Sequence, residues 1–245
     1  MISPNIIFSV VSHKQGDLVR NLFDDFDRLN FTFQVILTLN LPEDVDYIAN
    51  RNFPIKIVTN KSVKGFGENH NHAFKLLACD FFIVINPDIR ITKFDIQDLL
   101  SPFGDERIGV CGPQVLSLNG AVEDSARKSL TPARLFKRII TFSPQFDYQY
   151  DVPFFPDWIA GMFMIFRYGA FKEVDGFNSK DYFMYCEDMD ICRSLWRRNW
   201  AVFYNPSISV LHNARRDSRR NLRYLLWHIS SIVKYFLNRT SDRRC

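Results

Sequence analysis

Two carboxylates in this chain have the types and positions that group transfer requires. Asp88 ends the tripeptide Asn86-Pro87-Asp88, which follows the apolar run Phe81–Ile85. Asp88 is therefore expected at the carboxyl end of a strand, where open α/β sheets bind ligands. Asp188 follows Glu187 at the start of a segment with helical spacing. One acid that holds a metal and a second that accepts a proton are the minimum for displacing a nucleotide diphosphate.

Each of these acids also has a simpler interpretation. Asn, Pro and Asp all favour turns, so Asn86-Pro87-Asp88 could be a turn that merely ends the strand. Glu187, Asp188 and Asp190 could be acids that suit the positive end of a helix dipole. If instead these three share one site, their like charges raise one another's pKa, which helps a base to work near neutral pH.

Two further motifs fit a ligand site. Lys64-Gly65-Phe66-Gly67 precedes a predicted helix, and glycines there let the backbone come close to an anionic group at the helix start. The alternative is a tight turn that packs the helix on the sheet. Trp158-Ile159-Ala160-Gly161 offers an aromatic plane that can stack on a sugar, although a buried core tryptophan is an equal alternative.

The elements that must position these motifs alternate between strand and helix patterns. Apolar runs predict strands over 6–11, 33–39, 55–59 and 81–85, and helical spacing predicts helices over 16–29 and 68–78. Such alternation predicts an α/β fold with a mostly parallel central sheet flanked by helices.

The second half of the chain is less regular. Strands are predicted over 108–115, closed by Gly112-Pro113, and over 161–166, 202–204 and 208–211. A helix is predicted over 188–198, and a wide apolar face predicts another over 222–237. The proline-containing stretch 119–156 has no clear period, and so long a stretch is usually functional or mobile.

Bulk properties exclude several classes of protein. The 245 residues can bury a substantial core without disulfides or structural metal. The five cysteines are scattered and form no CxxC pair, which indicates reduced thiols in a cytoplasm. We find neither a signal peptide nor a run of about 18 apolar residues that could span a membrane.

The ordered motifs resemble those of the family 2 glycosyltransferases, and in particular the rhamnosyltransferase-like branch that builds bacterial surface polysaccharides. The resemblance extends from Ile6 to His212 and includes the motifs already described. It implies a GT-A (nucleotide-diphospho-sugar transferase) domain over residues 1–212, followed by a basic amphipathic helical extension over 213–245. It is carried by Gly65-Phe66-Gly67, Asn71, Asn86-Pro87-Asp88, Gly161, Gly176-Phe177, Glu187-Asp188 and His212.

The resemblance assigns roles to the acids. Asp88 corresponds to the last acid of the family's metal-binding motif, and Asn86 stands where the first acid is common. With His212 it would hold Mg²⁺ or Mn²⁺, although a lone histidine is more often structural. Asp188 corresponds to the catalytic base, which takes the acceptor hydroxyl's proton in a single, inverting displacement.

The resemblance also implies the residues that surround the substrates. The acceptor side would comprise Trp158, Gly161 and Glu187. The family's nucleobase-reading Asp after the second strand is missing here, because Thr38-Leu39-Asn40 stands in that region, so uridine and thymidine both remain open. The nucleotide-sugar site would comprise Ser12, Asn40, Gly65, Phe66, Asn71, Asn86 and Asp88.

The leading hypothesis is transfer of a sugar to a hydroxyl of a lipid-linked glycan in O-antigen or cell-surface polysaccharide synthesis. The first candidate for the donor is dTDP-rhamnose, which would supply L-rhamnose, and the other is a UDP-sugar. One alternative is a sugar-1-phosphate nucleotidyltransferase, but Ser12-His13-Lys14-Gln15-Gly16 lacks the Gly-rich basic start of that class. Another is a non-catalytic glycan- or nucleotide-binding homologue, which the intact Asp88 and Asp188 disfavour.

The C-terminal segment has a charge of its own. Residues 213–245 carry eight Arg and one Lys against Asp217 and Asp242, whereas the whole chain has a net charge of only +4. Arg215, Arg216, Arg219, Arg220 and Arg223 lead into an apolar helix with interfacial aromatics. This pattern predicts a peripheral protein on the inner face of the bacterial cytoplasmic membrane. The alternative is a helix packed on the domain or in a homodimer; no nucleic-acid motif is present.

Overall fold

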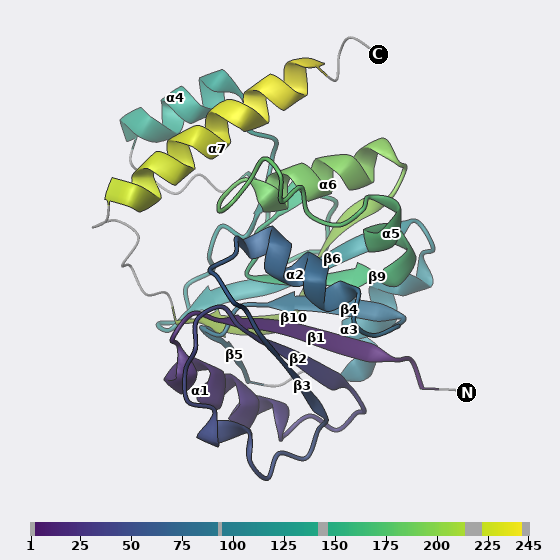
Figure 1. The fold of residues 1–245 in the computed structure, drawn as a ribbon. Coiled ribbons are helices and arrows are strands. Elements are labelled where there is room, and N and C mark those ends of the chain that lie inside the picture. The colour runs from purple at the N-terminus through teal and green to yellow at the C-terminus, as the bar shows by residue number, and fades with distance from the viewer. Residues whose placement is uncertain (1–2, 93–94, 142–146, 214–221, 242–245) are drawn as a thin grey trace.

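The computed structural model describes residues 3–92, 95–141, 147–213 and 222–241. Eight strands form one central sheet in the order β3-β2-β1-β4-β9-β6-β10-β5, and β7 and β8 form a separate pair. Figure 1 shows this sheet at the centre of the molecule with helices on either side. The strands are β1 (Ile6–Ser12), β2 (Gln34–Leu39), β3 (Ile55–Thr59), β4 (Phe81–Ile85), β5 (Ile89–Ile91), β6 (Ile108–Ser117), β7 (Ala126–Arg127), β8 (Trp158–Ile159), β9 (Phe163–Arg167) and β10 (Ala201–His212).

The sheet contains both parallel and antiparallel strand pairs, and more of its pairs are parallel. β1, β2, β3 and β4 pair in parallel, and β6 pairs in parallel with β10. β9 runs antiparallel between β4 and β6, and β5 runs antiparallel along the end of β10. The prediction of an α/β sheet is confirmed. Strand direction was not readable from apolar runs, because a buried run looks the same in either direction.

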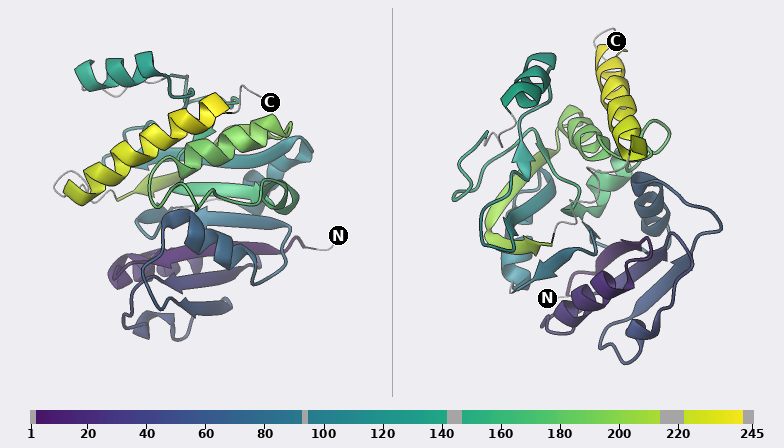
Figure 2. Two further views of the ribbon diagram at one scale, coloured as in Figure 1. Left: turned by 45° about the horizontal axis from the view of Figure 1, so that its top comes forward. Right: turned by 90° about the vertical axis from the view of Figure 1, so that its left-hand side faces the viewer.

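Helices cover both faces of the sheet. α1 and α3 pack on one face, whereas α2, α5 and α6 pack on the other, and α4 and α7 lie outside α6 (Figures 1 and 2). The helices are α1 (Gly16–Phe26), α2 (Phe66–Phe74), α3 (Ile96–Leu100), α4 (Pro132–Thr141), α5 (Tyr168–Glu173), α6 (Glu187–Arg197) and α7 (Leu222–Ser241), and two short 3₁₀ turns span Asp46–Ile48 and Ser101–Gly104.

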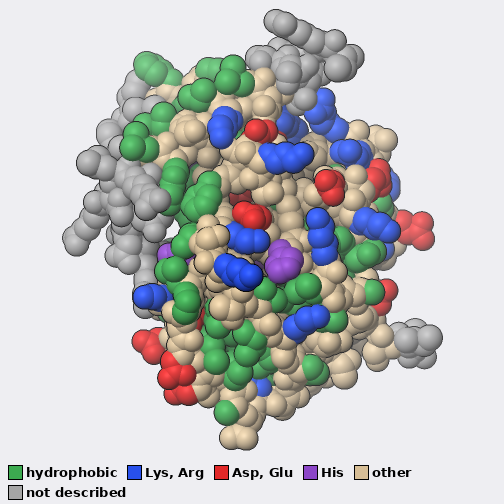
Figure 3. Space-filling model, in the orientation of Figure 1, with side chains coloured by type: hydrophobic (Ala, Val, Ile, Leu, Met, Phe, Trp, Pro, Cys, Tyr) green, Lys and Arg blue, Asp and Glu red, His purple; other side chains and the backbone are tan. Residues whose placement is uncertain are grey.

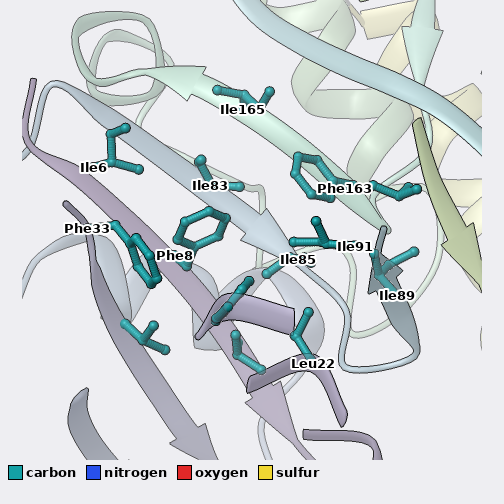
Figure 4. Close-up of a cluster of buried hydrophobic side chains, with 14 of the residues drawn as sticks. Ile6, Phe8, Leu22, Phe33, Ile83, Ile85, Ile89, Ile91, Phe163 and Ile165 are labelled. Carbon is teal, nitrogen blue, oxygen red and sulfur yellow. The ribbon is translucent and has the colours of Figure 1, made fainter. Parts of the chain in front are cut away.

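Alternation along the strands divides the core between the two faces. On β1, Phe8 and Val10 join the cluster under α1, whereas Ile7 joins the cluster under α2 and α6. Figure 4 shows the first cluster, in which Phe8, Phe33 and Ile83 meet. Each fully buried Phe or Ile contributes roughly 1.5–3 kcal/mol, so these layers fix the sheet that positions the site.

The structure corrects three predicted boundaries. Residues 202–204 and 208–211 belong to one strand, β10, which is interrupted by a register shift between Asn205 and Ser209. Gly112-Pro113 does not close β6, because the strand continues to Ser117; Pro113 lies opposite Asn205 at the irregularity, where a missing N–H is tolerated. The second helix spans Phe66–Phe74 instead of 68–78, since the chain turns after Phe74.

The stretch 119–156 is more structured than its sequence suggested. It contains β7 and the ten-residue helix α4, and a bridge pairs Phe154 with Tyr204 of β10. The helix predicted over 222–237 is present as α7, which has 20 residues and continues to Ser241. Arg215, Arg216, Arg219 and Arg220 lie outside the described residues. Within residues 3–92, 95–141, 147–213 and 222–241, no helix is both long and apolar enough to cross a bilayer.

Candidate active site

Asp88 and His212 meet where β4, β5 and β10 come together. Asp88 lies between β4 and β5, and the antiparallel pairing of β5 with β10 sets Ile89 opposite His212. The Nε2 atom of His212 is 3.5 Å from Oδ2 of Asp88, and the Asp88 carbonyl accepts a hydrogen bond from the Asn213 N–H. The strand after Asn86-Pro87-Asp88 thus brings a predicted metal pair together across 124 residues of sequence.

A third side chain, Glu123, holds the other ring nitrogen of His212. Nδ1 of His212 donates to Oε2 of Glu123 at 2.7 Å, since a carboxylate can only accept. Burial opposes protonation of the ring, but hydrogen bonds to Asp88 and Glu123 outweigh it and raise the pKa of His212 to about 9. The sequence prediction missed Glu123, which lies in the aperiodic stretch 119–156.

The donor set fits a divalent cation. Asp88 Oδ1 is buried and has no hydrogen-bond partner among the described residues, so it is an acceptor that still lacks a partner. A carboxylate oxygen and a histidine whose far nitrogen is held by a carboxylate are typical ligands, and Mg²⁺ usually takes its remaining ligands from substrate phosphates and water. No group of three or more His, Cys, Asp or Glu ligands occurs in the described part of the chain. The protein would therefore supply Asp88 and His212, and a bound ion would have to displace the proton of His212.

Asp188 is fixed at the start of α6 by two backbone groups. Its Oδ2 accepts from the Gly161 N–H at 3.1 Å and its Oδ1 accepts from the Met189 N–H at 2.8 Å. Gly161 has no side chain to intervene: a Cβ there would lie 3.3 Å from the Phe66 ring and 3.5 Å from Cβ of Asp188. The motifs of Phe66, Gly161 and Asp188, far apart in sequence, therefore touch.

Backbone contacts connect the two carboxylate clusters. Met162, next to Gly161, accepts at its carbonyl a hydrogen bond of 2.9 Å from the Asn86 N–H. Asn86 in turn accepts from the Ile89 N–H and closes the turn that presents Asp88. A continuous path of contacts thus joins Asp188 to Asp88 through Gly161, Met162 and Asn86.

Glu187 and Asp188 form a buried acidic pair. Burial first, and the neighbouring charge of Asp188 second, raise the pKa of Glu187 to about 8. Burial also raises the pKa of Asp188, although the N–H groups of Met189 and Gly161 and the charge of Arg127 oppose the shift. Asp190 does not join them, because its Oδ1 pairs with Arg193 at 2.6 Å. The expected crowding of acids is therefore limited to Glu187 and Asp188.

The backbone before α6 is twisted to present this pair. Tyr185 and Cys186 both have positive φ angles, 73° and 68°. Two consecutive non-glycine residues in this region each cost free energy, and such strain is concentrated at functional sites. Oε2 of Glu187 is buried without a hydrogen-bond partner in the described residues, a further cost that the fold tolerates here.

Glu187→Gln is expected to flatten the dependence of stability on pH. Because the pKa of Glu187 is about 8 in the folded chain and lower when unfolded, its contribution is complete below about pH 4.5 and is lost as the pH rises through 8. Gln cannot lose a proton. The melting temperature of the variant minus that of wild type should therefore be about 3 °C or more larger at about pH 8.5 than at about pH 5. A constant difference, or an equal gain for the exposed control Glu106→Gln, would contradict this account of the pair.

The glycines of Gly65-Phe66-Gly67 are required by packing. A Cβ on Gly65 would lie 2.4 Å from the carbonyl oxygen of Phe183, and one on Gly67 would lie 2.6 Å from Cβ of Phe177. The Phe66 N–H donates to the Phe183 carbonyl at 3.0 Å. The turn therefore holds α2 against the loop that leads into α6, which matches the packing interpretation of this motif and places Phe66 beside Gly161.

Gly65→Ala is expected to destabilise the fold by about 1–3 kcal/mol, because the new methyl group would overlap a backbone carbonyl that cannot rotate away. Chemical denaturation measures the change. Gly104→Ala is the matched control, since no atom lies within 4 Å of a Cβ at that position. Equal stability of the two variants would show that the close approach of Gly65 and Phe183 is unimportant.

The asparagines predicted to bind the nucleotide have internal partners. Asn71 bonds both the N–H and the carbonyl of Phe177, at 2.9 and 2.7 Å. Asn40 bonds both the N–H and the carbonyl of Lys64, and Asn60 bridges Asn40 to Asn69. The Asn40 amide thus holds the backbone of Lys64, and the Asn71 amide holds the backbone of Phe177. Their role toward a nucleotide stays a prediction.

Ser12 and Trp158, both predicted to contact substrates, have partners within the chain. Oγ of Ser12 accepts from the Gln15 N–H at the end of β1. The Trp158 ring is buried, its Nε1 donates to the Lys128 carbonyl, and the Arg127 guanidinium lies 5.0 Å from its ring centre. The guanidinium of Arg127 therefore lies over the ring of Trp158. The sequence prediction missed Arg127, because the only feature that marks this residue is its position in the aperiodic stretch 119–156.

Comparisons with known proteins agree with this geometry. Residues 38–173 match the family model for glycosyl transferase family 2. The rhamnosyltransferase WbbL of Escherichia coli K12 is 26% identical over 265 residues, which cover 96% of both chains. An N-acetylglucosaminyl-diphospho-decaprenol L-rhamnosyltransferase of Mycobacterium tuberculosis H37Rv is 29% identical over 194 residues, covering 74% of this chain and 63% of that protein.

Among solved structures, GalNAc-T7 with UDP, GalNAc and Mn²⁺ superposes with a TM-score of 0.69 at 15% identity, over 88% of this chain and 45% of that chain. This likeness establishes the fold, which is the GT-A fold expected from the motifs. The enzyme class follows from the family match, and the relatives place the chain in the rhamnosyltransferase-like branch. The chain is a member of glycosyl transferase family 2.

Proposed function

We propose that the protein is an inverting, metal-dependent glycosyltransferase that moves L-rhamnose from dTDP-rhamnose to a hydroxyl of a lipid-linked glycan during O-antigen or cell-surface polysaccharide synthesis. The observation that carries the proposal is the fixed Asp188 carboxylate, joined through Gly161, Met162 and Asn86 to the Asp88–His212 pair. In this proposal the donor sugar lies between the base, Asp188, and the cation that binds the donor's diphosphate.

Asp188 acts as the general base. It takes the proton of the acceptor hydroxyl as that oxygen forms a bond to the anomeric carbon. The bond from this carbon to the diphosphate oxygen breaks, and the electron pair leaves with the nucleotide diphosphate. A single displacement of this kind inverts the anomeric configuration. The raised pKa of Asp188 strengthens it as a base, and the two N–H groups that bind its oxygens keep it oriented.

Asp88 and His212 would hold Mg²⁺ or Mn²⁺ against the donor diphosphate. The bound cation would neutralise charge on the departing group. Nucleotide-sugar binding is assigned to Ser12, Asn40, Gly65, Phe66, Asn71 and Asn86, and the acceptor would enter beside Trp158, Gly161 and Glu187. These assignments rest on the motif positions and on the contacts that join the motifs.

Glu123→Gln is expected to weaken binding of Mn²⁺ in the presence of nucleotide by about 10–100-fold. The carboxylate that accepts from Nδ1 of His212 fixes the ring so that Nε2 faces Asp88, and an amide accepts that bond less strongly. Calorimetric titration of Mn²⁺ measures the change. Asp151→Asn, a change in the same stretch but away from His212, is the control; unchanged affinity in Glu123→Gln would remove Glu123 from this positioning role.

The donor and acceptor are inferred from the names of the relatives. One is called a rhamnosyltransferase, and another names N-acetylglucosaminyl-diphospho-decaprenol as its acceptor. We accordingly propose a sugar-diphospho-polyprenol acceptor, which places the enzyme in the cytoplasm, peripheral on the inner face of the bacterial cytoplasmic membrane.

Calorimetric binding of dTDP and UDP, with and without Mg²⁺ or Mn²⁺, tests the donor site. The proposal predicts cation-dependent binding of dTDP that exceeds binding of UDP. Tighter binding of UDP would replace the donor while keeping the reaction class. Absence of binding by both nucleotides in the presence of either cation would refute the proposed donor site.

A further inference from the structure

Helix α7 is attached to the domain through its polar and aromatic side. Ser231 donates to the Met184 carbonyl at 2.8 Å, and Tyr235 is 2% exposed beneath the Arg193 guanidinium. The Trp227 ring lies 4.7 Å from that of Phe183. Residues 227, 231, 235 and 238 follow one another at helical spacing, so they form a single packed side of the helix.

The opposite side of α7 is aliphatic and exposed. Leu226, Ile229, Val233 and Leu237 are 66%, 52%, 51% and 62% exposed. They recur every three or four residues and therefore form one continuous stripe. We call these four residues the aliphatic stripe. Phe136 of α4 is also 66% exposed, and α4 and α7 lie at the same end of the molecule (Figures 1 and 2).

An ordinary surface helix turns an apolar side to the core and a polar side to water. Helix α7 differs, because Ile232, Tyr235 and Phe236 pack against the core while the aliphatic stripe on its other side is also apolar and faces outward. Figure 3 shows hydrophobic side chains gathered over this end of the molecule. Contiguous exposed apolar surface of this kind marks an interaction site.

The charge around the stripe indicates what covers it. The segment 213–245, of which α7 is the described part, carries eight Arg and one Lys against two Asp, whereas the rest of the chain is net acidic. Lys234 of α7 is exposed, and its Nζ donates to the Asp181 carbonyl at 2.8 Å. An exposed aliphatic side on a strongly basic segment suits the surface of an anionic bilayer, because aliphatic side chains enter the acyl boundary and basic residues are attracted to anionic headgroups. A second copy of this chain would instead bring two such basic segments together.

We propose that the aliphatic stripe of α7 docks the enzyme on an anionic lipid bilayer, with α7 lying in the plane of the interface. This inference deepens the proposed function and rests on it only for the lipid nature of the acceptor. The packed side of α7 contacts residues 183–185, directly before Glu187 and Asp188. Docking through the stripe therefore holds the catalytic end of α6 close to the membrane that contains the acceptor.

Vesicle flotation with the full chain tests the surface directly. The probes are vesicles of phosphatidylglycerol and phosphatidylethanolamine, and neutral vesicles of phosphatidylcholine. The wild type is expected to float with the anionic vesicles, less so at high salt, and weakly with the neutral ones. Ile229→Ser/Val233→Ser is expected to lower the partition coefficient at least about tenfold, since two buried aliphatic side chains are lost. Ile57→Ser/Val63→Ser removes the same exposed residue types elsewhere, 39% and 44% exposed, and should bind as wild type.

Two measurements keep the outcomes distinct. Melting temperatures equal to wild type verify that both double variants fold, as expected for exposed positions. Transfer to a short water-soluble acceptor should be the same in Ile229→Ser/Val233→Ser as in wild type. If wild type itself transferred no sugar to this acceptor, the proposed function would be refuted, whereas the bilayer proposal would still be judged by flotation. Equal flotation of Ile229→Ser/Val233→Ser and wild type would overturn the bilayer proposal. So would a wild type that does not bind vesicles but forms dimers, if the same two substitutions make it monomeric.

Discussion

Asp188→Asn is expected to lower kcat by about 10³–10⁴-fold while leaving donor affinity within a few-fold of wild type. The amide cannot take the acceptor proton. It is nearly the same size as the carboxylate, and its oxygen can still accept the hydrogen bond from Gly161 or Met189, so the position of α6 is preserved. Steady-state transfer assays give kcat, and calorimetry with the nucleotide gives donor affinity.

The matched control for this result is Asp190→Asn, two residues further along α6. Asp190 pairs with Arg193 and accepts from the Tyr182 hydroxyl, so kcat of the variant should stay within about threefold of wild type at a temperature where it is folded. Asp188→Asn with near-normal turnover would remove Asp188 from the role of base. A proportionate loss of donor binding would instead indicate that the side chain acts in binding.

Asp88→Ala is expected to weaken cation-dependent binding of the donor nucleotide by more than about 100-fold. The substitution removes the carboxylate whose Oδ1 is buried without a partner, and it leaves only His212 to hold a cation against the diphosphate. Calorimetry of dTDP in Mn²⁺ measures the loss. The small binding that remains without cation should be the same in variant and wild type, because Asp88 acts through the ion.

Asp98→Ala provides the comparison, since Asp98 is exposed on α3 and its side chain has no part in the site. It should bind the nucleotide with cation as wild type does. If Asp88→Ala retained full cation-dependent binding, the Asp88–His212 pair would be a structural contact, and the cation would have to be held elsewhere.

The sequence was sufficient for the parts of the fold that local pattern controls. The runs at 6–11, 33–39 and 81–85 form buried strands because β-branched and aromatic residues there are packed from both faces, and the run at 55–59 forms the more exposed edge strand β3. It could not show that β9 enters between β4 and β6 in the opposite direction, because the order and direction of strands depend on distant pairings. The bend that makes β10 one strand was hidden for the same reason.

Site residues could be predicted from the sequence where they lie in a recognisable motif. They could not be predicted where their role is to contact and position another residue of the site. Asp88, Gly161 and Asp188 lie in recognisable short motifs, and backbone contacts connect these motifs in the structure. Glu123 and Arg127 lie in an aperiodic stretch, and only the folded chain sets them against His212 and Trp158. The same holds for α7: its apolar face was evident from spacing, but which side faces the protein was not.

One assay can test whether the protein carries out cation-dependent sugar transfer with Asp188 as base. Purified wild-type protein is incubated with dTDP-rhamnose, Mg²⁺ and a water-soluble analogue of a sugar-diphospho-lipid, and the product is examined by mass spectrometry and NMR. The account predicts a rhamnosylated acceptor with the anomeric configuration opposite to that of the donor, one dTDP released for each product, and no product in the presence of a chelator. A product that retains the donor's configuration, or equal turnover with chelator present, would contradict it.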